Sequence, residues 1–204
     1  MSAKTLAVDC GGSGTRLLHS ARRFKASLPP VSWELGGPEL LAQAVVEGWL
    51  SLGSPPTDAV GIGIAATPDL ATAARLAAEI GRQLGAERVL IANDAVTGHL
   101  GALRGEAGVA LIVGTGVACV RWDPQREWAP RFFDGHGPLI ADAGSAAWIG
   151  RQAVRAVLDA AQDGRPPAAL AERVALRWGN LAEVPARLHA LANPVGELGD
   201  FGRE

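Results

Sequence analysis

The sequence predicts an α/β protein made of two related halves. Short apolar runs of strand length alternate with segments whose apolar residues recur at helical spacing, as in a sheet covered by helices. After residue 109 the element order begins again as it began at the N-terminus. We therefore expect two lobes, residues 1–104 and 105–204. The strand-like runs are 4–10, 59–65, 88–94 and 108–116.

Three helices are expected in the first half, over residues 39–52, 69–84 and 94–104. Glycines follow the first two as stop signals. The inner faces are expected to carry Leu41, Ala44, Val45, Gly48 and Leu52 in the first helix, and Leu70, Ala73, Ala77, Ile80 and Leu84 in the second.

The second half opens with a predicted hairpin, because a glycine turn joins the apolar runs 108–116 and 117–123. A third strand is expected near 131–133. A helix should follow over 145–160, with Ile149, Ala153, Ala156 and Ala160 facing inward. Pro166 and Pro167 open another helix that Gly179 closes, and a further short helical pattern includes Pro185.

Composition narrows the class of protein. With 19 Lys and Arg against 21 Asp and Glu, the formal net charge is −2, which leaves no basic surplus for nucleic acid or an anionic membrane. No segment approaches the roughly 18 unbroken apolar residues of a membrane helix. We expect a cytoplasmic protein, whose Cys10 and Cys119 are free thiols.

A predicted strand ends within residues 6–16, LAVDCGGSGTR. An aspartate stands at its end, and a glycine-rich turn follows. Such a turn lets backbone N–H groups approach a phosphate closely, and small hydroxyls add donors. A carboxylate beside phosphates is best explained as a Mg²⁺ partner acting through bound water. The alternative is a tight hairpin turn capped by Asp9. The residues concerned are Asp9, Gly11, Gly12, Ser13, Gly14 and Thr15.

Three later stretches carry candidate chemistry. Gly114, Thr115 and Gly116 form a second glycine turn at the matching place in the second half. Asn93 and Asp94 stand where a strand ends and a helix begins, so Asp94 is a candidate general base. The alternative is an Asx helix cap, and the two roles are compatible. Residues 134–150, DGHGPLIADAGSAAWIG, are either a site segment or a loop with a capped helix start. The glycines of GIGIAA, 61–66, fall inside a strand and argue against a dinucleotide fingerprint.

Together these stretches resemble the actin, sugar kinase and heat-shock chaperone superfamily, and within it the BadF/BadG/BcrA/BcrD ATPase family, which includes N-acetylglucosamine and glucosamine kinases. The matching motifs are LAVDCGGSGTR, IAND, LIVGTG and HGPLIADAGSAAWIGRQAV. The resemblance implies a ribonuclease H-like (actin-like ATPase) fold with two related lobes. It implies that the second lobe is incomplete, since the adenine-binding glycine motif and the last strands would lie beyond residue 204.

The resemblance also implies roles for single residues. Asp9 would hold Mg²⁺ through water, and the turns 11–15 and 114–116 would bind the phosphates of ATP. Asp94 would take the proton from the attacking sugar hydroxyl. The sugar-contacting positions would be Asn93, His136, Gly137 and Asp142.

Some positions depart from the family pattern. Position 136 is His where the aminosugar kinases usually carry Trp, Ala143 replaces a common acidic residue, and the segment 20–38 lacks the sugar-binding asparagine.

The function expected first is therefore ATP-dependent phosphorylation of an aminosugar. The alternatives are a BadF-type ATPase, whose relatives bind an iron–sulfur cluster through cysteines that Cys10 and Cys119 do not match, and a non-catalytic nucleotide-binding or regulatory relative. Without its closing strands, the second lobe should expose apolar surface, which predicts self-association, for instance as a homodimer, or protease sensitivity beyond about residue 160. Because the adenine-binding motif would lie beyond residue 204, ATP should be held by phosphate contacts alone and therefore bind weakly.

Overall fold

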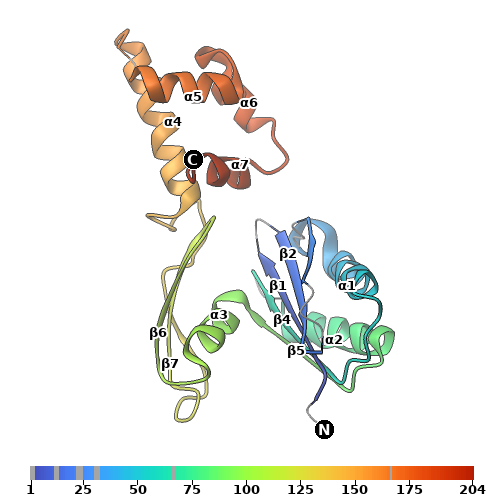
Figure 1. Ribbon diagram of the computed structural model, residues 1–204. Helices are drawn as coiled ribbons and strands as arrows, with labels where there is room; N and C mark the ends of the chain where they lie inside the picture. The colour runs from blue at the N-terminus through green and yellow to red at the C-terminus, as the bar shows by residue number, and fades with distance from the viewer. Residues whose placement is uncertain (1–2, 12–13, 22–24, 30–32, 66–67, 166) are drawn as a thin grey trace. The chain divides into compact units, whose positions relative to one another are not determined.

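The computed structural model describes residues 3–11, 14–21, 25–29, 33–65, 68–165 and 167–204 (Figure 1). By its internal contacts the chain divides into two compact units. The first comprises residues 1–110 with 120–131, and the second comprises 111–119 with 132–204. This division is one of contacts, so the predicted lobe boundary at residue 104 stays a prediction.

The first unit contains a five-stranded sheet in the order β3-β2-β1-β4-β5. Strands β1 and β2 form an antiparallel hairpin that β3 extends, whereas β1, β4 and β5 run parallel. The strand bounds are Thr5–Gly11 (β1), Gly14–His19 (β2), Lys25–Leu28 (β3), Ala59–Ile64 (β4) and Arg88–Asn93 (β5). The strands predicted at 4–10, 59–65 and 88–94 are confirmed.

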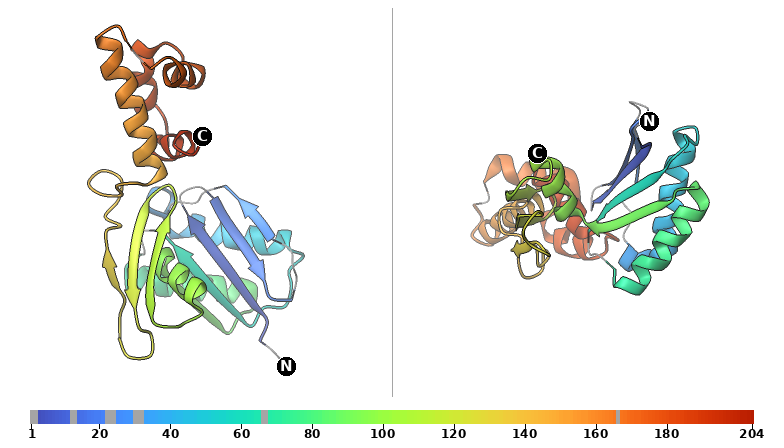
Figure 2. Two further views of the ribbon diagram at one scale, coloured as in Figure 1. Left: turned by 60° about the vertical axis from the view of Figure 1, so that its left-hand side comes forward. Right: turned by 90° about the horizontal axis from the view of Figure 1, so that it is seen from below.

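Helices cover both faces of this sheet (Figures 1 and 2). Helices α1 (Trp33–Ser51) and α2 (Leu70–Leu84) lie on one face, and α3 (Asp94–Leu103) lies on the other. Strand β1 alternates, so that Leu6, Val8 and Cys10 are buried in the core toward α1 and α2. Asp9, by the same alternation, points toward the α3 face.

The first two helices begin and end close to the predicted positions. Gly37 has a φ of 76°, which interrupts α1 just before Pro38, and Gly85 closes α2 in the left-handed conformation. The prediction that Leu70 faces inward is wrong. Leu70 is 91% exposed because it is the first residue of α2, beyond the reach of the core, and Leu76 is buried with Ile80 and Leu84 instead.

A second sheet has three strands in the order β6-β7-β8, with bounds Gly108–Val113, Val117–Trp122 and Arg131–Phe133. Residues 114–116 connect β6 to β7, which confirms the predicted hairpin. The helices that follow are α4 (Ala146–Gln162), α5 (Ala168–Trp178), α6 (Val184–His189) and α7 (Pro194–Phe201), with a short 3₁₀ turn at Leu181–Glu183. Pro166, one of the two predicted helix-opening prolines, lies outside the described residues.

Helix α4 turns inward a face that matches the predicted one only in part, since Ala153 packs against the core as expected. Ile149 is 45% exposed and Ala156 is exposed, whereas Gly150, Val154 and Val157 are buried. The reason is the close approach of α7. A Cβ on Gly150 would lie 2.0 Å from the Leu198 carbonyl oxygen, so this backbone contact needs glycine.

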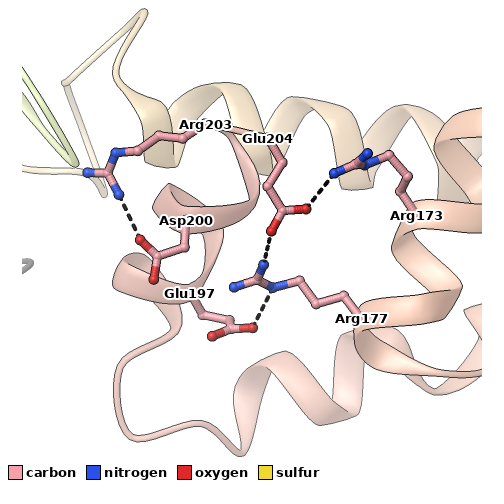
Figure 3. Close-up of polar contacts among 6 residues, drawn as sticks. All are labelled: Arg173, Arg177, Glu197, Asp200, Arg203 and Glu204. Carbon is pink, nitrogen blue, oxygen red and sulfur yellow. Dashed lines mark hydrogen bonds and ion pairs between the residues drawn. The ribbon is translucent and has the colours of Figure 1, made fainter.

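The helices of the second unit enclose a core of their own. Its buried side chains are Val154, Val157, Val174, Trp178, Val184 and Phe201. At its edge, ion pairs join α5 to α7 and to the last residue (Figure 3). Arg177 donates to Glu197 at 2.7 Å and also binds Glu204, which accepts from Arg173 at 2.8 Å. Among the described helices, none is long and apolar enough to cross a membrane.

Candidate active site

Two aspartates come together at the carboxyl edge of the first unit's sheet. Asp9 lies near the end of β1, and Asp94 begins α3 directly after β5. Strand β4 runs between them, and its Gly63 is the register partner of Asp9. A Cβ on Gly63 would lie 2.2 Å from Thr97 Oγ1, so glycine is what lets the first turn of α3 rest on the sheet. That contact holds Asp94 at the same edge as Asp9.

The Asp94 carboxyl is partly buried, and burial raises its pKa above the ordinary value. The backbone N–H of Ala95 opposes this rise, and the negative charge of Asp9 adds to it. The capping bond of α3 comes from the preceding residue, since Asn93 Oδ1 accepts from Ala95 N at 3.0 Å. The structure therefore assigns the capping role to Asn93. A carboxyl with a raised pKa at a sheet edge is chemically suited to accept a proton.

Arg16 is a site residue that the sequence analysis missed. Its Nη1 donates to Asp9 Oδ2 at 3.2 Å, and the two side chains are 61% and 53% exposed. The pair follows from the hairpin register, because Gly11 pairs with Gly14 and Asp9 therefore lies opposite Arg16. The spacing of the glycine turn was the available signal.

The residues predicted to bind phosphate in the first glycine turn have different places in the structure. Gly11 and Gly14 end the paired part of the hairpin, while Gly12 and Ser13 lie outside the described residues. The Thr15 side chain is fully buried, on the core face of β2 beside Cys10. Only the backbone of Thr15 is thus placed to meet a ligand on the Asp9 side.

Cys10 should be far less reactive than Cys119 in the folded protein. Burial raises the pKa of the Cys10 thiol to about 11, with a smaller opposing effect of Thr15, whereas Cys119 is partly exposed. At pH 8 this pKa lowers the thiolate fraction about 100-fold relative to an ordinary thiol. We expect iodoacetamide to label Cys119 first, and a Cys119→Ser variant to react quickly only in urea. Rapid labelling of Cys10 in the native variant would contradict its burial.

The second glycine turn is held from the α4 side. The N–H groups of Ala146 and Ala147 donate to the carbonyl oxygens of Gly114 and Thr115, at 3.0 and 3.2 Å. Asp142 is 5% exposed, and its Oδ2 would lie 2.7 Å from a Cβ on Gly116. The structure therefore brings Asp142 to the predicted turn 114–116.

Asp142 also borders a cavity of about 360 Å³ in the second unit. Most of its wall is apolar, and it is lined by Pro138, Leu139, Ala141, Asp142, Ser145, Ala147, Trp148, Arg151, Leu188, His189, Pro194, Val195 and Leu198. His136 is exposed and, like Gly137, is not part of this lining. The predicted sugar-contacting residues of this segment thus separate into Asp142 at the cavity and His136 on the surface.

Over the part of the chain that the structure describes, no group of three or more His, Cys, Asp or Glu residues is placed to hold a metal ion. The Mg²⁺ role of Asp9 stays a prediction, in which water and phosphate oxygens would supply the remaining ligands.

Neither a protein-family model nor a curated protein matches the chain. Solved structures do. A protein of Chromobacterium violaceum, provisionally named N-acetylglucosamine kinase, is 24% identical with a TM-score of 0.70, over 98% of this chain and 73% of its own. A protein of Porphyromonas gingivalis with the same provisional name is 20% identical with a TM-score of 0.77, over 98% and 71%.

A more distant match extends the likeness beyond these two proteins. MreB5 of Spiroplasma citri, bound to ADP, is 10% identical with a TM-score of 0.53, over 79% of this chain and 58% of its own. At these identities the likeness concerns the fold. The predicted fold class is confirmed: the chain has the α/β fold of the actin-like ATPases.

Proposed function

We propose that the protein transfers the γ-phosphoryl group of ATP to a hydroxyl of an aminosugar of the N-acetylglucosamine or glucosamine type. The observation that carries this proposal is the placement of Asp94, a partly buried carboxyl with a raised pKa, beside Asp9 at the carboxyl edge of an actin-like sheet. The two structural neighbours provisionally named as N-acetylglucosamine kinases support the same chemistry.

In this proposal Asp94 accepts the proton of the sugar hydroxyl as that oxygen attacks the γ-phosphorus. Asp9 holds the water shell of Mg²⁺, which neutralises phosphate charge when bound. Arg16, which pairs with Asp9, is the cation that would bind a phosphate oxygen in this proposal. Most of the rate enhancement then comes from positioning and from charge stabilisation at the transferring group.

The sugar subsite in this proposal uses Asn93, His136, Gly137 and Asp142. Asn93 Oδ1 already caps α3, which leaves its amide NH₂ as the donor to a sugar oxygen. The carboxylate of Asp142 can accept from sugar hydroxyls beside the cavity. The turns at 11–15 and 114–116 bind the ATP phosphates, which remains a prediction of the sequence.

An ATP-consumption assay over a panel of sugars tests the function. We expect turnover that depends on one aminosugar and yields its phosphate ester, detected by mass spectrometry. Sugar-independent ATP hydrolysis would instead identify a BadF-type ATPase. Binding of ATP with no turnover would identify the non-catalytic alternative, and the absence of both binding and turnover would refute nucleotide chemistry.

Asp9→Asn should change the Mg²⁺ dependence of turnover, raising the Mg²⁺ concentration at half-maximal rate by roughly 10-fold. The reason is that a water-mediated Mg²⁺ site loses its charged partner while the rest of the turn is kept. A Mg²⁺ titration at fixed, saturating ATP measures the change. Asp159→Asn, an exposed carboxylate paired with Arg155, is the matched control and should leave the titration unchanged. An unaltered titration in Asp9→Asn would exclude the metal role.

A further inference from the structure

The turn at 114–116 is held on its second side by α7 and the residues that follow it. Arg203 Nη2 donates to Thr115 Oγ1 at 2.8 Å, across 88 positions of sequence. The other end of the guanidinium is anchored, since Nη1 donates to Asp200 Oδ1 at 2.7 Å (Figure 3). Gly199 lies against the methyl group of Thr115, where an added Cβ would be 3.0 Å from Cγ2.

These contacts determine how the Thr115 hydroxyl can act. A guanidinium has donors only, so Thr115 Oγ1 must be the acceptor in its bond with Arg203. The hydroxyl proton is therefore directed away from Arg203 and remains to be donated elsewhere. With the methyl group against Gly199, the rotamer of Thr115 is held at the same time.

The acidic groups around the turn argue against a role for Arg203 in attracting an anionic ligand by its charge alone. Asp200 shares the Arg203 guanidinium, and Asp142 Oδ2 lies close to Gly116 on the turn itself. Arg203 is therefore largely neutralised by its own neighbour. Its contribution to an anionic ligand has to come from orienting a donor rather than from adding net positive charge.

We propose that Arg203 is a positioning residue that orients the Thr115 hydroxyl as a hydrogen-bond donor to a phosphate oxygen of bound ATP. This inference rests on the proposed function, because it takes the turn 114–116 as a phosphate-binding turn. It adds a residue from the end of α7 to that site.

A double-mutant cycle on the full chain tests the coupling, with Mg-ATP binding measured by calorimetry. Arg203→Met and Thr115→Val should each weaken Mg-ATP binding by roughly 10-fold, the size of one lost hydrogen bond to a charged group. The double variant should bind no more weakly than Thr115→Val alone. Thr115→Ser, which keeps the hydroxyl, and Arg203→Lys, which keeps a donor, should each recover most of the loss.

Arg173→Met is the matched control, because Arg173 is also an ion-paired arginine of the second unit, but its partner is Glu204, whereas Arg203 binds Asp200 and Thr115. It should leave Mg-ATP binding unchanged. Hydrogen exchange in α4 and α7 separates a structural from a positioning role, since loosened packing would speed exchange in Arg203→Met but not in Thr115→Val.

The outcomes distinguish the two proposals. Additive losses in the double variant, or an unchanged affinity for Mg-ATP in Arg203→Met, would overturn the role of Arg203. Sugar-dependent turnover by the wild type would still support the proposed function in that case. If the wild type neither binds Mg-ATP nor consumes it, both proposals fail.

Discussion

Asp94→Asn should lower sugar phosphorylation by about 10²- to 10⁴-fold, the usual loss when a positioned general base is removed. The fold should be retained, because Asn93 makes the capping bond of α3 and because asparagine has nearly the same shape as the aspartate that it replaces. Steady-state kinetics with the preferred sugar measure the loss. Turnover close to that of the wild type would show that Asp94 is not the base.

The raised pKa of Asp94 gives this variant a second expected property. Burial first, and then the charge of Asp9, disfavour the ionised carboxyl in the folded protein. The stability associated with this group is therefore fully present below the unfolded-state pKa and is lost as pH rises through the folded-state pKa. At pH 7 the wild type has lost this stability, whereas an asparagine cannot ionise. Asp94→Asn should therefore be more stable than the wild type in urea unfolding.

Asp69 provides a control with the opposite sign. It caps α2, and hydrogen bonds from Thr72 lower the pKa of its carboxyl. Its contribution is present above the unfolded-state pKa and is lost as pH falls through the folded-state pKa, so Asp69→Ala should destabilise the protein at pH 7.

If Asp94 is the base, the acid limb of kcat/KM should lie at a higher pH than the ordinary pKa of an aspartate. It should move to lower pH in Asp9→Asn, because that variant removes the charge of Asp9, which is one cause of the raised pKa of Asp94.

Gly150→Ala should destabilise the helical part of the second unit by roughly 3 kcal/mol or more, since overpacking against rigid backbone exceeds the usual cost of a larger core side chain. The new methyl group would meet the Leu198 carbonyl oxygen at 2.0 Å. Gly202→Ala should act in the same way, because its Cβ would meet the Ala146 carbonyl oxygen at 2.0 Å. Faster hydrogen exchange in α4 and α7 measures the effect.

Gly101→Ala is the matched control for this prediction. Gly101 lies inside α3, and a Cβ there would have no neighbour within 4 Å. Alanine should therefore stabilise that helix by about 0.5–1 kcal/mol. If Gly150→Ala leaves exchange in α4 as slow as in the wild type, α7 does not pack on α4 as described.

Local patterns in the sequence were sufficient to predict much of the fold. The short apolar runs that begin near residues 4, 59, 88 and 108 predict strands from their own residues. Helix ends are also local, as Gly85 shows. The placement of Asp94 at a strand end follows from the same signals, because strand and helix boundaries depend on neighbours in sequence.

The contacts between elements depended on residues that lie far apart in sequence. Apolar spacing located α4 but only part of its inner face, which the backbone contact of Gly150 with Leu198 selects. In the sequence Gly63 belongs to the GIGIAA pattern, which resembles a dinucleotide fingerprint. In the structure the absence of a side chain at Gly63 leaves room for Thr97, and this contact holds Asp94 at the sheet edge. The Arg203 contact with Thr115 joins positions 88 residues apart. Periodicity describes one element by itself, whereas the face that becomes buried depends on which partner can approach closely enough to cover it.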